Sequence, residues 1–347
     1  MIPLIDLAPG YSIPRLILGG WQLSAGHSGR LVDPTAAFDE WDHWLDRGAN
    51  TFDCADIYTG VEALIGDYIR RRRARGQAPP QVHTKFVPDL AALPTLDRRY
   101  VGQVIDRSLR RLGLERLDLV QFHWWDYEVP GAVEALHWLD DLRRDGKIRL
   151  IGLTNFDTSH LDRLLATGVS IASLQLQYSV LDQRPARGLA RRAAANDVGL
   201  LCYGTLAGGF LSERWLGAVA PTRPANRSLV KYGLVIEDGG GWLWFQGVLR
   251  ALRAVADRHG VDLATVALRW VLDREGVTAA IVGIRPGGRL EDLAAAMQIR
   301  LSDDDEHLIR SATGPSPGPE GDVYAAERVR GGRHAAIMRY DLNRDPV

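Results

Sequence analysis

Two aspartates and a tyrosine lie close together in the segment FDCADIY, residues 52–58, directly after a short apolar run. Further along the chain, Lys85 lies within the run VHTKF and His123 follows the run LVQF. A tyrosine with an ordinary pKa of about 10 is a poor acid at neutral pH, but a nearby ammonium lowers that pKa. A carboxylate holds such a lysine in place, and a neutral imidazole orients a carbonyl oxygen. The set Asp53, Tyr58, Lys85 and His123 is therefore suited to delivering a proton to a carbonyl oxygen.

Each of these residues also has an ordinary structural explanation. Asp53 could cap the next helix, Tyr58 could be a surface aromatic residue, and His123 could be a core histidine. Lys85 has few such explanations, because its neighbours in the sequence are apolar. We expect Asp56 to be a loop carboxylate without a part in the chemistry. The four residues taken together are more specific than any one, and since none supplies a hydride, a cofactor must supply it.

The elements that must position these residues alternate regularly along the chain. Apolar runs of strand length, such as residues 81–86, 117–124 and 148–156, are followed by amphipathic segments such as 100–114. Near-continuous apolar strands are typical of a parallel sheet that is covered on the outside. The repeated alternation predicts an α/β fold, a (β/α)8 TIM barrel, with an N-terminal β-hairpin in residues 2–14. In such a barrel the active site lies at the carboxyl ends of the strands, where the four residues are found.

Two segments interrupt this alternation. Residues 208–243 follow the predicted seventh strand and are rich in glycine and proline, which predicts a long and functional loop. Residues 312–347 follow the last barrel helix and contain Ile337, Met338 and Tyr340. We expect them to form an ordered C-terminal extension over the barrel mouth or an oligomer surface. The predicted organisation is a barrel over residues 1–311 with an extension at 312–347 that is not a separate domain.

The composition is that of a globular protein without a marked charge. The chain has 347 residues, 46% of them hydrophobic and 24% charged, and a net charge of −1. These values argue against disorder and favour neither nucleic acid nor an anionic membrane as a partner.

Cys54 and Cys202 lie in predicted strands and are expected to be buried thiols in a reducing compartment. Because the sequence shows neither a signal-peptide pattern nor a long apolar run, we expect a cytoplasmic protein.

Several segments resemble the signature segments of the aldo-keto reductase superfamily. They are TFDCADIYTG, VHTKF, LDLVQFHWW, GKIRLIGLTNF and RWVLDREGVTAAIVGIR, and the resemblance runs in order over residues 12–300. It implies a (β/α)8 barrel that reduces an aldehyde or ketone with NADPH. It also implies a catalytic tetrad of Asp53, Tyr58, Lys85 and His123. Tyr58 would be the general acid in reduction and the general base in oxidation.

The resemblance further implies a cofactor site at the barrel mouth. Thr154, Asn155 and Gln175 match the residues that hydrogen-bond the nicotinamide carboxamide, and Tyr203 matches the aromatic residue that stacks on the nicotinamide ring. The segment 204–210 matches the loop that wraps the pyrophosphate. The expected cofactor-binding set is completed by Gly20, Gly204, Leu206, Gly208, Gly283, Arg285, Arg289 and Asp292.

The segment IVGIRPGGRLEDL departs from the family pattern. Arg285 and Arg289 fit a 2′-phosphate or an adenine face. Gly283 and Leu293, however, stand where many members carry lysine and asparagine. NADP (NADPH) is therefore the favoured cofactor, and NAD stays open. A Rossmann site is not expected, because the chain lacks a strand-linked GxGxxG.

Trp21 and Trp124 match positions that wall the substrate pocket in the family, although core packing would also explain either of them. An aromatic mouth suits aldehydes, ketones and sugar-like or secondary-metabolite carbonyls.

A second hypothesis is a cofactor-binding regulatory subunit of the aldo-keto reductase type with little turnover. A metal-dependent barrel hydrolase is a weaker third, because the sequence has no His-x-His pair or carboxylate ladder, and no metal is expected. The sequence leaves monomer and homo-oligomer undecided.

Overall fold

A closed barrel of parallel strands forms the centre of the molecule. The structure is a computed structural model, and it describes residues 1–28, 33–284, 290–314 and 317–343. The strands are hydrogen-bonded in the order β10-β3-β4-β5-β6-β7-β8-β9. They are β3 (Leu16–Gly19), β4 (Thr51–Asp53), β5 (Gln81–Phe86), β6 (Leu117–Phe122), β7 (Ile148–Thr154), β8 (Ser173–Gln177), β9 (Gly199–Tyr203) and β10 (Val277–Gly283). The predicted (β/α)8 TIM barrel is thereby confirmed.

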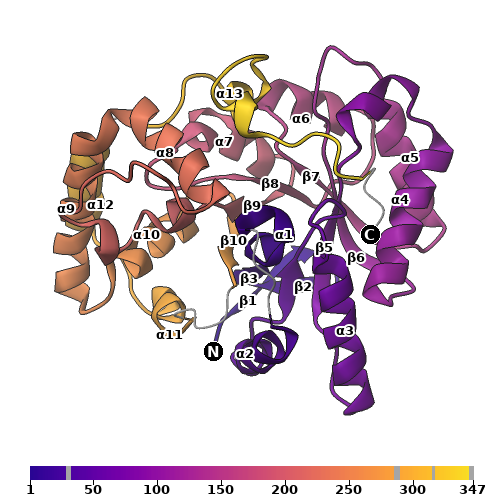
Figure 1. Cartoon of the computed structure of the whole chain (residues 1–347), viewed down its shortest axis with the longest axis horizontal. Coiled ribbons are helices and arrows are strands. Elements are labelled where there is room, and N and C mark those ends of the chain that lie inside the picture. The colour runs from indigo at the N-terminus through magenta and orange to yellow at the C-terminus, as the bar shows by residue number, and fades with distance from the viewer. Residues whose placement is uncertain (29–32, 285–289, 315–316, 344–347) are drawn as a thin grey trace.

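Helices surround the barrel and connect its strands (Figure 1). Those that alternate with the first strands are α2 (Pro34–Asp46), α3 (Val61–Ala74), α4 (Arg98–Leu112), α5 (Ala132–Arg144), α6 (Thr158–Leu165) and α7 (Leu189–Ala194). The later helices are α8 (Arg227–Gly239), α9 (Gly241–His259), α10 (Leu263–Leu272), α11 (Leu290–Ala294) and α12 (Asp303–Thr313). Two short helices, α1 (Ala25–Ser28) and α13 (Ala325–Arg328), lie outside this alternation. Among the described residues, no helix is long and apolar enough to cross a membrane.

Side chains at the helix ends explain where several helices begin. Asp97 accepts a hydrogen bond from the Tyr100 amide at the start of α4, and Asp157 accepts one from the His160 amide at the start of α6. These contacts satisfy amide groups that a helix leaves free in its first turn. At the other end of α4, Gly113 takes a φ of 65°, a left-handed conformation that glycine adopts without strain.

An N-terminal hairpin closes one end of the barrel, as predicted. It consists of β1 (Leu4–Ala8) and β2 (Tyr11–Pro14), which pair antiparallel. Its side chains Leu7, Tyr11 and Ile13 join an apolar cluster with residues from inside the barrel. The Tyr11 hydroxyl lies 3.0 Å from Nε2 of His83 on β5. This end of the barrel is therefore filled by side chains, and the site residues lie at the other end.

The long connection after β9 is more structured than its composition suggested. Glycine and proline in residues 208–243 predicted one long loop, but 227–239 form α8 and α9 begins at Gly241. Asn226 starts α8 by accepting a hydrogen bond from the Leu229 amide. In Figure 1 the last described segment, drawn in yellow, runs from α13 across the top of the barrel. Together with α8 it covers the mouth of the barrel.

Candidate active site

Alternation along the strands brings the polar residues into the barrel. In β5 the side chains of Val82 and Phe86 face the outer helices, so His83 and Lys85 face inward. The register pairs Asp53 with His83 and Lys85 with Gln121. Inward residues at the carboxyl ends of neighbouring parallel strands are thereby held side by side.

A buried ion pair lies at the centre of the site. The Lys85 Nζ lies 2.9 Å from Oδ1 and 2.8 Å from Oδ2 of Asp53, and it also donates to the Cys54 carbonyl oxygen at 2.7 Å. Asp53 and Lys85 are each 4% exposed. Burial lowers the pKa of Lys85, but the neighbouring Asp53 carboxylate and Tyr58 hydroxyl raise it by more, so that the pKa ends above its ordinary value. The lysine is therefore held as a charged ammonium.

Two glutamines complete the surroundings of Asp53. Gln121 Nε2 donates to Asp53 Oδ1 at 2.9 Å, and Gln175 Nε2 donates to the same oxygen at 2.6 Å. Gln175 was expected to contact a cofactor, whereas Gln121 was not singled out in the sequence. The signal was present, because Gln121 stands two residues before His123 and so shares its inward face.

Tyr58 lies over the lysine. Its ring centroid is 5.1 Å from Lys85 Nζ and 5.1 Å from the ring centroid of Trp21. Burial raises the pKa of the Tyr58 hydroxyl, and the opposing effect of Lys85 does not cancel it. The sequence had predicted a lowered pKa from the ammonium alone. That prediction was wrong because it did not weigh desolvation, which is the larger effect at this position.

His123 is held in one orientation. Its Nδ1 lies 3.0 Å from the Thr154 carbonyl oxygen, and a carbonyl only accepts, so Nδ1 carries the proton. Burial lowers the pKa of His123 to about 3, so the ring is neutral near pH 7. Nε2 is buried and has no hydrogen-bond partner among the described residues. In this tautomer Nε2 is an acceptor, suited to a hydroxyl rather than to a bare carbonyl oxygen.

The residues expected to hold a nicotinamide lie together at the strand ends. Thr154 ends β7 in register with Gln175 of β8. Asn155 follows with a φ of 62°, and its amide donates to the Gln175 carbonyl oxygen at 2.9 Å. The Tyr203 hydroxyl donates to Asn155 Oδ1 at 2.8 Å. These neutral amide and hydroxyl groups, buried at Thr154 and Gln175 and partly exposed at Asn155 and Tyr203, fit a nicotinamide with its carboxamide.

The loop expected to wrap a pyrophosphate packs tightly against α8. Gly204 and Gly208 have φ values of 70° and 64°, a left-handed conformation that favours glycine. A Cβ atom on Gly204 would overlap the Tyr232 hydroxyl, and one on Gly208 would lie 2.7 Å from Cδ2 of Tyr232. Leu206 lies between the two glycines and packs against the apolar core. Helix α8 thus forms the opposite wall of this loop.

The remaining expected cofactor residues are more scattered. Gly20 is buried at the end of β3, close enough to Asp53 that a Cβ would lie 3.1 Å from its carbonyl oxygen. Gly283 ends β10 beside the Gln22 side chain. Asp292 lies in α11, where its carbonyl oxygen accepts a hydrogen bond from Thr265 Oγ1 at 2.7 Å. Arg285 and Arg289 lie outside the described residues.

The two tryptophans expected to wall the substrate pocket differ in position. Trp21 contacts Tyr58, as noted above. Trp124 is fully buried on the outer side of its strand, where its ring packs against Phe122 and Nε1 donates to the Val129 carbonyl oxygen at 2.9 Å. Trp125 lies beside His123 instead, with ring centroids 4.4 Å apart. Trp125 is therefore a better candidate for a pocket residue than Trp124.

The C-terminal extension reaches the site from above. The Tyr324 ring lies 5.6 Å from the His123 ring, and the Tyr340 ring lies 5.0 Å from that of Trp125. Asn343 Nδ2 donates to Asp56 Oδ2 at 3.2 Å. Asp56, which was expected to be an ordinary loop residue, is thus a buried anchor for the extension, although it does not contact the Asp53–Lys85 pair in any described hydrogen bond.

Among the residues that the structure describes, no cluster of histidine, cysteine, aspartate and glutamate could hold a metal ion. The polar groups described at the barrel mouth are the Asp53–Lys85 ion pair, the His123 imidazole, and amide and hydroxyl groups such as those of Asn155 and Tyr203.

Comparison with known proteins agrees with this geometry. The model of the aldo/keto reductase family matches residues 15–313. The chain belongs to the aldo/keto reductase family, a family of oxidoreductases that generally use NAD(P)H.

Two curated proteins and one solved structure show how similar this chain is to known proteins. The chain is 26% identical over 308 residues to aldo-keto reductase AMT2 of Alternaria alternata, covering 80% of this chain and 81% of that protein. It is 30% identical over 251 residues to flagellar radial spoke protein 5 of Chlamydomonas reinhardtii, covering 61% of this chain. The match spans only 47% of that longer protein. The crystal structure of the thermostable aldo-keto reductase Tm1743 with the inhibitor epalrestat superposes with a TM-score of 0.67 at 26% identity, covering 90% of this chain and 100% of that one.

Proposed function

We propose that this chain is an NAD(P)H-dependent reductase that converts an aldehyde or ketone to an alcohol. The observation that carries the proposal is the buried Asp53–Lys85 ion pair beneath the Tyr58 ring, beside a neutral His123. Such a set has no evident role in packing, because a buried ion pair rarely adds stability. It is instead suited to holding a proton next to a reacting oxygen.

In the proposed mechanism a bound, reduced nicotinamide supplies the hydride. Tyr58 is protonated near pH 7, as an ordinary tyrosine is, and burial raises its pKa further. It donates that proton to the substrate oxygen. The Lys85 ammonium then stabilises the phenolate that remains, and Asp53 holds Lys85 in place. His123 Nε2 accepts a hydrogen bond from the hydroxyl group that has formed. Thr154, Asn155, Gln175 and Tyr203 would hold the nicotinamide and its carboxamide.

The cofactor, the substrate class and the domain organisation are proposed from the sequence. NADPH is favoured over NADH because of Arg285 and Arg289, with NAD as the alternative. The substrate is proposed to be a small carbonyl compound that fits an aromatic mouth formed by Trp21, Trp125 and Tyr324. We also propose that the barrel 1–311 and the extension 312–347 act as one unit in the cytoplasm, where unpaired thiols such as Cys54 and Cys202 stay reduced.

A binding and turnover experiment tests the function. Purified protein is titrated with NADPH and NADH by tryptophan fluorescence, and then assayed with aldehydes, ketones and sugars by nicotinamide absorbance. We expect binding and carbonyl-dependent oxidation of the cofactor. Binding without turnover on the whole panel would favour a regulatory subunit, and absence of dinucleotide binding would contradict the proposal.

The variant Tyr58→Phe tests the assigned acid. It removes the donated proton while keeping the ring, so turnover should fall by about 100-fold or more with cofactor binding unchanged. The control is Tyr68→Phe, which removes a hydroxyl that bonds Asp42 in the outer helix layer and should leave turnover intact. Near-normal turnover in Tyr58→Phe would show that another group is the acid.

A further inference from the structure

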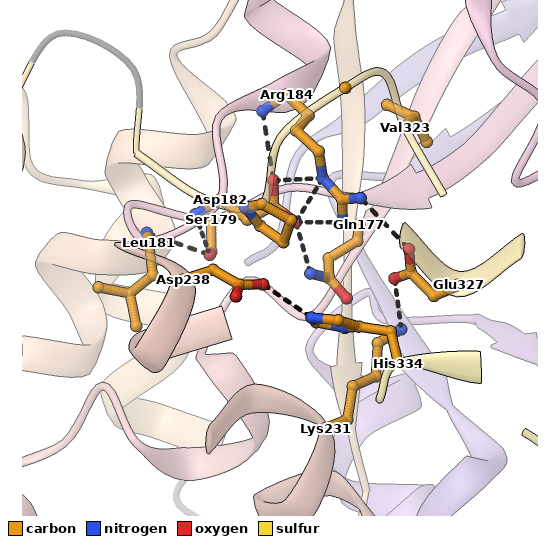
Figure 2. Close-up of polar contacts among 12 residues, drawn as sticks. Gln177, Ser179, Leu181, Asp182, Arg184, Lys231, Asp238, Val323, Glu327 and His334 are labelled. Carbon is orange, nitrogen blue, oxygen red and sulfur yellow. Dashed lines mark hydrogen bonds and ion pairs between the residues drawn. The ribbon is translucent and has the colours of Figure 1, made fainter. Parts of the chain in front are cut away.

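A chain of buried charges links the barrel to the C-terminal extension (Figure 2). Asp182 follows β8, Arg184 begins the next turn, and Glu327 belongs to α13. Arg184 Nη2 lies 2.7 Å from Asp182 Oδ2, and its Nη1 lies 3.2 Å from Glu327 Oε2. These three residues are at most 2% exposed. The guanidinium is therefore bound by a carboxylate on each side.

Lys231 of α8 forms the end of this chain. Its Nζ lies 4.0 Å from Glu327 Oε1, an oxygen with no hydrogen-bond partner among the described residues. The charges thus alternate from Asp182 through Arg184 and Glu327 to Lys231. Glu327 is hydrogen-bonded to Arg184 and also forms an ion pair with Lys231, so Lys231 is the positive end of this alternating chain.

This positive end faces Tyr203. Lys231 Nζ lies over the Tyr203 ring, 5.0 Å from its centroid, and 3.5 Å from its hydroxyl oxygen. The ring of Tyr324 lies on another side of the same ammonium, at 5.8 Å. Aromatic faces attract a cation, which favours this position in a buried site. Burial lowers the pKa of Lys231 below its ordinary value, and the Glu327 charge offsets part of that shift.

The position of this charge matters if Tyr203 carries a nicotinamide, as the proposed function requires. The oxidised nicotinamide ring is a cation, whereas the reduced ring is neutral. An ammonium beside Tyr203 would repel an oxidised ring stacked on that tyrosine and would leave the reduced ring almost unaffected. In a partly buried site such a repulsion can change an affinity by about tenfold or more.

We propose that Lys231 is a specificity-determining residue, which makes the site bind the reduced cofactor more tightly than the oxidised one. The proposal rests on the proposed function, since it needs a dinucleotide at Tyr203. It goes beyond that function because it assigns the preference between the two redox forms to one side chain of α8. Glu327 of the extension then positions Lys231 from the opposite side.

Equilibrium binding tests the proposal without relying on turnover. Dissociation constants are measured for NADP⁺ and NADPH, for NAD⁺ and NADH, and for ADP-ribose and its 2′-phosphate, which lack the nicotinamide. In the wild type we expect the oxidised form to bind more weakly than the reduced form. In Lys231→Met the ratio of the two constants should fall by about tenfold. Binding of the ligands without nicotinamide should not change.

Two further variants separate charge from shape. Lys231→Gln is a second neutral side chain and should lower the ratio as Lys231→Met does, whereas Lys231→Arg keeps the charge and should preserve it. An unchanged ratio in both neutral variants, with dinucleotides still bound, would overturn this inference and leave the proposed function intact. Equal weakening of all ligands, including those without nicotinamide, would also overturn it, because Lys231 would then bind the phosphates. A wild type that binds no dinucleotide would overturn both proposals.

Discussion

The Tyr58 hydroxyl carries the proton that the proposed reaction needs. Burial raises the pKa of its hydroxyl even though Lys85 lies beneath the ring. A protonated phenol can donate to a carbonyl oxygen, and the phenolate that remains would take a proton from an alcohol in the reverse reaction. The proposed effect of the Lys231 ammonium falls on the cofactor, through an oxidised nicotinamide that it disfavours. Two residues from different elements would thus act on the proton and on the cofactor of the proposed reaction.

Gln121 acts on this chemistry through Asp53, and we predict that it is a positioning residue. Gln121→Leu removes a hydrogen bond to a charged carboxylate, which is worth about 1.5 kcal/mol or more, so kcat should fall by about tenfold with little change in KM. Gln121→Glu should be more active at low pH, where the new carboxyl group can still donate, and should lose activity steeply as it ionises beside Asp53. Steady-state kinetics over a pH series measure both effects.

A purely structural role for Gln121 would give a different result. In that case the two variants would lose activity in parallel at every pH, and thermal stability would fall with it. Wild-type kcat in Gln121→Leu would mean that Lys85 and Gln175 hold Asp53 without help.

At the scale of elements, α3 and α4 approach one another at a glycine. A Cβ atom on Gly66 of α3 would overlap the carbonyl oxygen of Arg111 in α4. Because backbone atoms cannot move aside easily, the helices would have to separate. Gly66 therefore fixes the distance between two helices that cover β4 and β5, the strands that carry Asp53 and Lys85.

We predict that Gly66→Ala destabilises the protein by about 1–3 kcal/mol, the usual cost of overpacking. The matched control is Gly102→Ala in α4, where a Cβ would meet nothing within 4 Å. That change should be neutral or stabilising by up to about 1 kcal/mol, because alanine is the better helix former. Urea unfolding of both variants measures the difference, and equal stabilities would refute the steric explanation.

The elements differ in how far the sequence predicted them. The apolar runs at 81–86 and 117–124 predicted β5 and β6, with Lys85 inward in β5 and His123 directly after the observed end of β6, because strand alternation is local. Helix α8 was missed, since the glycines and prolines on either side of 227–239 concealed its amphipathic pattern. Without α8, no sequence pattern indicated that Lys231 lies next to Tyr203. The raised pKa of Tyr58 was also missed, because burial depends on the whole fold.

At the scale of the molecule, the extension is tied to the barrel by residues distant in sequence. Glu327 meets Arg184 across 143 positions, and Asn343 meets Asp56 across 287. No local pattern encodes such pairs, so the sequence could suggest only that the extension covers the mouth or an oligomer surface. Arg328 adds bonds to the Trp124 and Asn155 carbonyl oxygens at 2.9 and 3.0 Å.

Buried titratable groups make the stability of the whole molecule depend on pH. Burial lowers the pKa of His83 and of His123 to about 3, whereas an unfolded histidine takes up a proton below about pH 6.5. Their contribution to stability is therefore full above about pH 6.5 and is lost as the pH falls toward 3. Burial raises the pKa of Asp56 to about 7, so its contribution has the opposite sign, present below about pH 4 and lost as the pH rises through 7.

We predict that Asp56→Asn makes the protein more sensitive to acid. Between about pH 4 and 6.5, the two histidines lower the free energy of unfolding as the pH falls, and Asp56 raises it. Each group changes this free energy by roughly 1.4 kcal/mol per pH unit. Without Asp56, the free energy of unfolding should therefore fall more steeply toward low pH, by about the contribution of one group. Urea unfolding at several pH values compares the two slopes. Identical slopes in wild type and variant would mean that Asp56 is ionised in the folded protein throughout this range.

The extension that covers the barrel mouth has a consequence for the order of synthesis. Residues 317–343 are made after all the barrel strands, so the strands can meet before the extension covers their mouth. During that interval a small molecule can enter the site without displacing the extension. The finished protein must displace the extension before a molecule enters the site, whereas a chain that is still being made need not.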